Sequence, residues 1–140
     1  MAGAFEAVRR LVAERFGERV FLISKCHKPA QHKTLHWLEH HRFYDRTGVH
    51  REHVYFCLER SEKADICKEL GITHFVDDRM DVLKNLPVTM GLYWFRPHFR
   101  EVRRYAQFLH RVRRVNSWLE VLGEFLPRAS LASEHEEKLG

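Results

Sequence analysis

Four short apolar runs alternate with stretches of helical spacing, and this alternation constrains the fold more than any other feature of the chain. The runs cover residues 20–23, 53–58, 72–76 and 89–95. Continuous apolar runs of this length are typical of strands that are covered on both faces, as in a parallel sheet. We therefore predict an α/β fold whose mainly parallel, Rossmann-like sheet has about four strands flanked by helices.

Helical spacing of apolar residues predicts helices between and after these strands. They are expected over residues 4–16, 29–41, 62–70, 80–86 and 99–126, with a polar loop over 44–51. The last of them is the longest, because its apolar residues form one broad stripe over most of the segment. The sequence thus predicts a single domain over residues 1–126, a long C-terminal helix and a polar, frayed tail over 127–140.

Composition narrows the setting. No apolar run approaches the roughly 20 residues that span a bilayer, so no membrane partner is expected. The three cysteines have no CxxC spacing and cannot all pair within one chain, which favours reduced thiols in the cytoplasm. The net charge of +5 is concentrated in one segment of the chain. Residues 96–114 hold seven arginines and one acidic residue, Glu101.

The most specific motif is the acidic pair Asp77 and Asp78 at the end of the third apolar run. Ligands of open α/β sheets bind at the carboxyl ends of strands, and adjacent carboxylates suit Mg²⁺. The alternative is a solvated turn in which an aspartate caps the following helix. Ser24 ends the first run and Lys63 lies in the first turn of a helix. A hydroxyl, a lysine and two carboxylates together favour a phosphate site.

On these residues the chain resembles the haloacid-dehalogenase-like (HAD-like) superfamily, most members of which are phosphatases. Ser24 in VFLIS is similar to the hydroxyl of the second family motif, which binds the phosphoryl group. Lys63 is similar to the third-motif lysine, and Asp77 and Asp78 in HFVDDR to the metal-binding fourth motif, with Asp78 as the direct ligand. The resemblance implies Mg²⁺-dependent hydrolysis of a phosphorylated small molecule, a phosphomonoester.

One family motif is missing. The resemblance implies an earlier strand that ends in Asp-x-Asp and supplies the nucleophile, yet the first nineteen residues contain no aspartate. Asp45 in a loop and Asp65 within a helix are poor substitutes. We therefore expect weak binding of phosphate and Mg²⁺ with little or no turnover, either because the chain begins late or because it is a natural pseudoenzyme.

The missing strand also has a structural consequence. In the family it lies between the strands of the second and fourth motifs. The strands at residues 20–23 and 72–76 should therefore pair directly, or a strand of another chain should fill the gap. A homo-oligomer formed through this gap or through the C-terminal helix is the expected assembly.

Two other patterns compete with this interpretation. His36 to His40 matches HxxEH, a zinc-peptidase motif, but eleven histidines in 140 residues make chance matches common. Cys26 lacks the Cys-x₅-Arg loop of thiol phosphatases, so a free thiol is expected there.

The arginines of residues 96–114 leave a different function open. They are either the solvated face of an amphipathic helix or a contact surface for an acidic partner such as RNA. The alternative function is therefore a non-catalytic binding or scaffold module that uses the basic C-terminal helix.

Overall fold

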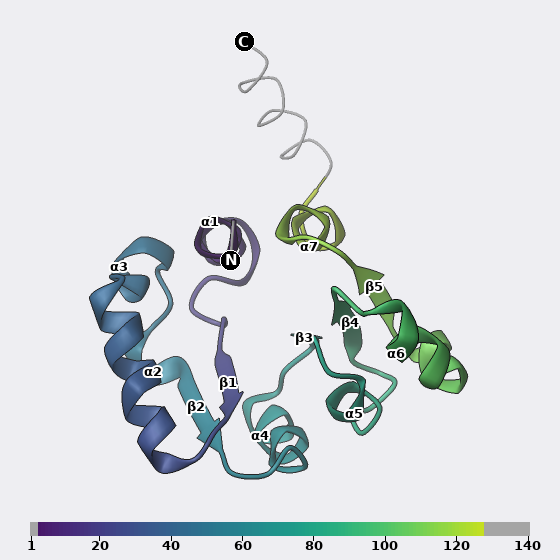
Figure 1. Ribbon diagram of the computed structural model, residues 1–140. Helices are drawn as coiled ribbons and strands as arrows, with labels where there is room; N and C mark the ends of the chain where they lie inside the picture. The colour runs from purple at the N-terminus through teal and green to yellow at the C-terminus, as the bar shows by residue number, and fades with distance from the viewer. Residues whose placement is uncertain (1–2, 128–140) are drawn as a thin grey trace. The chain divides into compact units, whose positions relative to one another are not determined.

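The computed structural model describes residues 3–127, which divide into two compact units. The first unit combines the N-terminal segment with the C-terminal helix, and its described part consists of residues 3–56 and 118–127. The second unit is the continuous segment Cys57–Ser117. Figure 1 shows the elements of both units along the chain.

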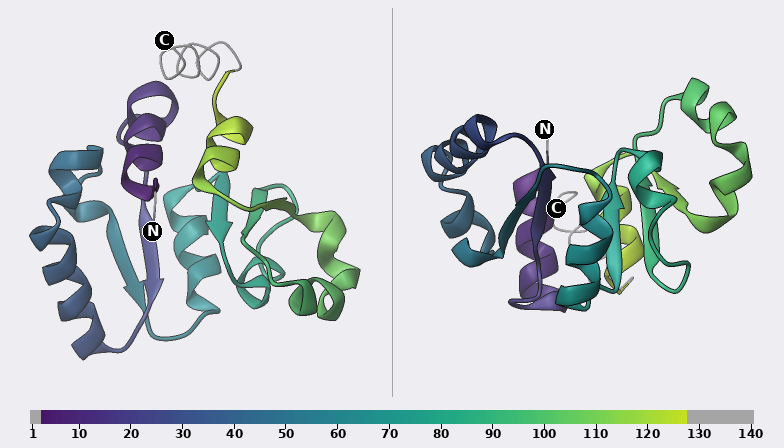
Figure 2. Two further views of the ribbon diagram at one scale, coloured as in Figure 1. Left: turned by 45° about the horizontal axis from the view of Figure 1, so that its top comes forward. Right: turned by 90° about the horizontal axis from the view of Figure 1, so that it is seen from below.

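Among its described residues, the first unit contains four α-helices and a two-stranded sheet of β1 and β2. Figure 2 draws the arrows of the two strands in the same direction. A π-helical turn, η1, continues the first helix, and a 3₁₀ turn, η2, precedes β2. The elements are α1 (Ala4–Leu11), η1 (Val12–Phe16), β1 (Leu22–Lys25), α2 (Lys28–His40), α3 (Phe43–Thr47), η2 (Arg51–His53), β2 (Val54–Cys57) and α7 (Trp118–Phe125).

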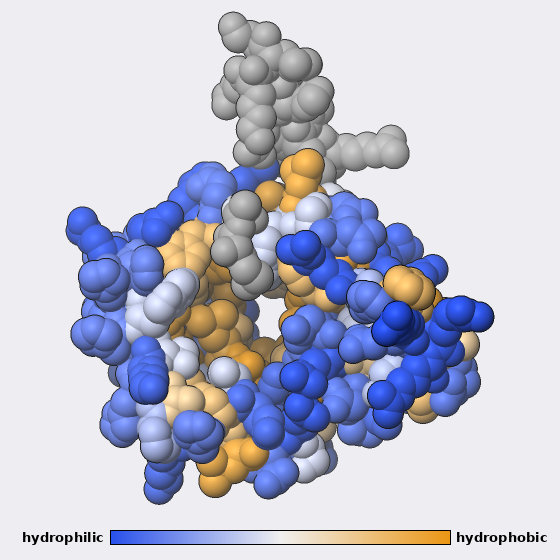
Figure 3. Space-filling view, in the orientation of Figure 1, coloured by the Kyte–Doolittle hydropathy of each residue, from blue (hydrophilic) through white to orange (hydrophobic). Residues whose placement is uncertain are grey.

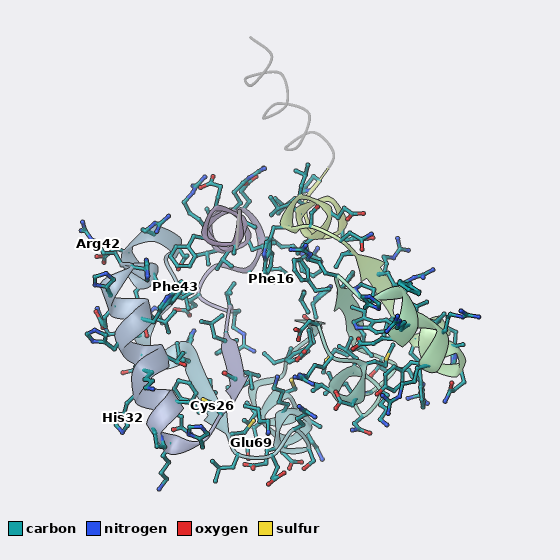
Figure 4. All side chains as sticks on the ribbon, in the orientation of Figure 1. Phe16, Cys26, His32, Arg42, Phe43 and Glu69 are labelled. Carbon is teal, nitrogen blue, oxygen red and sulfur yellow. The ribbon has the colours of Figure 1, made fainter. Side chains whose placement is uncertain are left out.

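The core of the first unit forms where α1 meets α2 and α3. Leu38, Phe43 and Val49 are buried there, and apolar side chains of α1, β1 and β2 pack against them. The rings of Phe5 and Phe43 meet edge to face with centroids 5.2 Å apart. Figure 4 shows Phe43 turned toward α1, whereas the neighbouring Arg42 points away from the unit. Helical spacing in α1 thus buries one face, which includes Arg10 with its ion pair to Glu14, and leaves Glu6 and Arg9 exposed.

The second unit contains a three-stranded parallel sheet in the order β3-β4-β5. His74 lies opposite Gly91, and Tyr93 lies opposite Arg113. Its elements are α4 (Glu62–Leu70), β3 (His74–Asp77), α5 (Met80–Leu83), β4 (Gly91–Phe95), α6 (Phe99–Arg104), η3 (Ala106–Arg111) and β5 (Arg113–Val115). The connections from β3 through α5 and from β4 through α6 have the helical crossovers that parallel strands require.

Trp94 is the largest fully buried side chain of this unit. Met80, Leu83 and Val115 are also almost completely buried. Helix α5 contacts both β3 and β4, as Figure 1 shows. β4 lies in the centre of this sheet, and its apolar residues are buried, as is typical of a parallel strand that is covered by helices.

The predicted α/β class with parallel strands is confirmed, and the helix predicted over residues 62–70 coincides with α4. Gly71 ends that helix as expected: its φ is +69°, and the N–H of Ile72 donates to the carbonyl of Cys67 at 3.0 Å. A left-handed residue of this kind is a common helix stop because glycine has no Cβ to strain.

The long helix predicted over residues 99–126 is wrong. The segment forms α6, η3, β5 and α7 in succession. Arg113–Val115 pairs in parallel with β4, and the N–H of Arg96 donates to the carbonyl of Val115 at 2.7 Å. Pairing with a neighbouring strand satisfies these backbone groups and buries Val115, so tertiary contacts override the helical spacing.

Two further expectations change in detail. The loop predicted over residues 44–51 contains α3 and the beginning of η2, and the hydroxyl of Thr47 donates to the carbonyl of Phe43 at 2.8 Å. The tail predicted over 127–140 lies, apart from Pro127, outside the described residues. Within residues 3–127, none of the helices has the length and apolar character needed to cross a membrane.

The expectation for the missing strand involves one strand from each unit. β1 belongs to the sheet β1-β2 and β3 to the sheet β3-β4-β5. Whether a strand of another chain joins them stays a prediction.

Candidate functional site

Lys63 and Asp77 form a buried ion pair in the second unit. Lys63 lies in the first turn of α4, and Asp77 is the last residue of β3. The Lys63 Nζ is 3.0 Å from the Asp77 Oδ2, and the two side chains are only 10% and 7% exposed. Two of the four residues predicted to form the site are therefore in direct contact at the carboxyl end of a parallel strand.

The second carboxylate oxygen of Asp77 is also occupied. Its Oδ1 accepts a hydrogen bond from the N–H of Arg79 at 2.9 Å. Burial raises the pKa of the Asp77 carboxyl, and the positive charge of Lys63 offsets part of this rise. The aspartate thus holds the lysine in place and is itself held by the turn that begins α5.

Asp78 is differently placed. Its side chain is exposed at the start of the turn that follows β3. Its carbonyl accepts a hydrogen bond from the indole Nε1 of the buried Trp94 at 3.0 Å. The backbone at Asp78 is therefore fixed to β4, while its exposed side chain lies close enough to Asp77 to contribute to the raised pKa of that carboxyl.

These carboxylates provide an incomplete ligand set for Mg²⁺. The Asp77 oxygens are engaged by Lys63 and by the N–H of Arg79, which leaves the Asp78 carboxylate as the exposed donor of the predicted pair. Within residues 3–127, no group of three or more histidine, cysteine, aspartate and glutamate side chains is placed to hold a metal. Proteins commonly bind Mg²⁺ through one or two carboxylates together with water and substrate phosphate. The residues of this pair therefore do not form a magnesium centre on their own.

A second ion pair in the same unit escaped the sequence analysis. The Arg60 Nη1 lies 2.8 Å from the Asp81 Oδ2 and connects the turn before α4 with the first turn of α5. Arg60 and Asp81 are 21 residues apart, and no local spacing links them. They come together only when the second unit has folded, so the sequence carries no signal for this contact.

Cys67 borders the Lys63–Asp77 pair from the next turn of α4. Its side chain is 1% exposed, and burial raises the pKa of its thiol to about 11. Cys26, Cys57 and Cys67 form no disulfide among the described residues. A protonated, buried thiol at this position packs as a small apolar group and is a poor nucleophile.

Ser24, the fourth predicted residue, lies on β1 in the first unit. Lys63 and Asp77 belong to the second unit. The role of Ser24 as a hydroxyl donor to phosphate stays a prediction.

The HxxEH pattern occupies the exposed face of α2. The rings of His36 and His40 are stacked with centroids 6.4 Å apart, and a shallow pocket around them is lined entirely by α2. Glu39 forms an ion pair with Arg51. The geometry therefore gives no third ligand that would complete a zinc site among the described residues.

Comparisons with protein-family models, with curated proteins and with solved structures find no match to this chain.

Proposed function

We propose that this chain is a HAD-like, phosphohydrolase-type protein that binds the phosphoryl group of a phosphomonoester at the carboxyl end of β3. The observation that carries the proposal is the buried contact between Lys63 and Asp77. A buried lysine is costly unless it is paired. An ammonium group has three donors, and Asp77 takes one of them, so two are left for phosphate oxygens.

The surroundings of the pair support an anion at this position. The ammonium of Lys63 is oriented by a buried carboxylate, and the turn that follows β3 is fixed through Trp94. A cation that is held in place before the ligand arrives stabilises charge on phosphate without reorganisation. The exposed carboxylate of Asp78 is the residue that we propose as a contact for Mg²⁺ that accompanies the phosphate.

Turnover is expected to be weak or absent. The buried carboxylate of Asp77 is engaged on both oxygens, so it is not available to attack phosphorus. In the proposal Lys63 binds phosphate oxygens, and the nucleophile of the family's first motif is missing from the given sequence. Reduced cysteines, which form no disulfide among the described residues, are consistent with the proposed cytoplasmic location.

Phosphate binding can be tested directly on the purified chain. We expect inorganic phosphate to shift the amide resonances of residues 77–79 and of the first turn of α4 in ¹H–¹⁵N spectra. Lys63→Gln should abolish the shifts, and Lys63→Arg should retain them in part. Lys68→Gln is the matched control, because Lys68 is exposed in the last turn of the same helix.

Two results would contradict the proposal. If phosphate leaves residues 77–79 unshifted, or shifts them equally in a folded Lys63→Gln variant, the site does not bind phosphate through Lys63. If the chain hydrolyses p-nitrophenyl phosphate rapidly with Mg²⁺ and Asp78→Ala abolishes that activity, the expectation of weak turnover is wrong.

A further inference from the structure

We propose that the crossover from β4 to β5 is a binding surface for single-stranded RNA. This surface, the arginine surface, comprises the residues of α6 and β5 that carry exposed arginines: Arg100, Arg103, Arg104, Arg113 and Arg114. The proposal is independent of phosphoryl binding by Lys63, because the two sets of residues do not overlap.

The segment around α6 and β5 carries a strong local positive charge. Residues 96–114 contain seven arginines and one acidic residue. Arg100, Arg103, Arg104 and Arg114 form no ion pair in the part of the chain that the structure describes, so their charges are not neutralised by carboxylates. Figure 3 shows strongly hydrophilic residues gathered over the region of α6 and η3. A local cationic surface of this kind attracts a phosphodiester backbone.

These arginines do not lie on one continuous helix. On a single amphipathic helix they would be the ordinary solvated face opposite an apolar stripe. The segment is instead divided among α6, η3 and β5, and the N–H of Arg96 attaches the end of β4 to β5 at 2.7 Å. Arg113 and Arg114 lie on a strand that pairs with β4, so the sheet fixes their backbone, and their side chains point to opposite faces of it.

An exposed aromatic residue lies among the arginines of α6. Phe99, the first residue of α6, is 63% exposed. One of its faces stacks on the ring of His98 with centroids 4.6 Å apart, and the guanidinium of Arg100 lies 5.8 Å from its centroid. The His98 Nδ1 accepts from the N–H of Arg100, which fixes the histidine ring at the start of α6.

The exposed ring of Phe99 beside arginines favours single-stranded over double-stranded nucleic acid. Unpaired bases stack on aromatic side chains and on guanidinium planes, whereas the bases of a duplex are already stacked on each other. An acidic polypeptide would contact the arginines but has no bases to stack on Phe99. The combination therefore favours single-stranded RNA over duplexes and over acidic polypeptides.

The test measures the fluorescence anisotropy of a labelled single-stranded RNA of about 12 nucleotides. We expect binding that weakens steeply as the salt concentration rises from about 50 to 200 mM. The variant Arg103→Gln/Arg104→Gln/Arg114→Gln should bind at least about tenfold more weakly and should lower the slope of log K against log salt by about 2. The control Lys25→Gln/Lys28→Gln/Lys33→Gln removes the same charge from exposed positions of the first unit and should bind as the unchanged chain does.

Stacking is tested with Phe99 alone. Phe99→Ala should weaken RNA binding about tenfold without changing the salt slope, and Phe99→Trp should retain binding. Because Phe99 is exposed, neither change should disturb folding, which circular dichroism checks.

Other outcomes overturn the proposal. Equal loss of affinity in the lysine control would mean that binding follows net charge alone. Equal or tighter binding of a duplex or of poly-glutamate, with no effect of Phe99→Ala, would assign the arginines to another partner. Tighter binding of DNA of the same sequence would assign the surface to DNA, and no binding at low salt would remove it altogether.

Discussion

At the scale of single residues, the second unit depends on a charged pair in a place where charges are expensive. Lys63 and Asp77 are each about nine-tenths buried and 3.0 Å apart. Their attraction offsets the loss of hydration only while both are present. Replacing either residue alone therefore leaves a buried charge without a partner, whereas replacing one member of an apolar pair of the same size would not.

Asp77→Asn should lower the free energy of unfolding by about 3 kcal/mol, because it leaves the buried ammonium of Lys63 without a counter-charge. Asparagine still accepts the hydrogen bond from the N–H of Arg79, so the turn is retained. The double variant Lys63→Met/Asp77→Asn removes both charges and should be more stable than Asp77→Asn alone. Urea unfolding of the single variants and the double variant measures the coupling, and strictly additive effects would contradict it.

Cys67 gives the second unit a dependence on alkaline pH. Burial raises the pKa of its thiol from 9.0 in the unfolded chain to about 11 in the folded protein. Between these values the unfolded chain loses the thiol proton and the folded protein keeps it, so stability is complete below pH 9 and falls as the pH rises toward 11.

The measurement compares the unchanged chain with Cys67→Ala in reducing buffer. The stability advantage of the cysteine over alanine should decrease by about 2 kcal/mol between pH 8 and pH 10.5, since each pH unit is worth about 1.4 kcal/mol. The comparison cancels other groups that titrate in this range. An advantage that is constant with pH would contradict the raised pKa.

At the scale of elements, the prediction for Gly71 concerns the end of α4. Gly71 has a left-handed conformation with a φ of +69° and closes the helix through hydrogen bonds to the carbonyls of Cys67 and Lys68. Gly71→Ala should cost about 1 kcal/mol, because its Cβ is strained in this conformation. Gly71→Asn should cost less, since asparagine tolerates it better. Urea unfolding that ranks alanine as equal to glycine would contradict this role.

The sequence was sufficient for the elements that carry a clear period and local stop signals. The apolar run before Asp77 and the helical spacing between Ser61 and Gly71 predicted β3 and α4 closely. These are also the elements that bring Lys63 and Asp77 together, so half of the predicted site followed from local pattern.

The sequence was not sufficient for β5. Arg113–Val115 is three residues long and buries only Val115, so it has neither an apolar run nor an alternation that marks a strand. Its conformation depends on the free side of β4, a contact between segments 20 residues apart. The Arg60–Asp81 ion pair was missed for the same reason, because it exists only after the elements have assembled.

At the scale of the whole molecule, the first unit is assembled from both ends of the described chain. Helix α7 follows the entire second unit in sequence yet packs against α1. The Arg15 Nη1 donates to the carbonyl of Phe125 at 2.6 Å, and the rings of Phe16 and Phe125 meet edge to face. The first unit therefore cannot complete its core until the second has been synthesised.

The last prediction follows from this arrangement. Phe125 is 6% exposed, and Phe125→Ala should lower the unfolding free energy of the first unit by about 3 kcal/mol through the cavity that it leaves. Leu119→Ala is the matched control, because Leu119 belongs to the same helix and is 65% exposed. Hydrogen exchange separates the two units: Phe125→Ala should reduce protection in α1 and α7 and leave that of β3 and β4 unchanged. Equal loss of protection in β3 and β4 would show that the two units unfold as a single cooperative body.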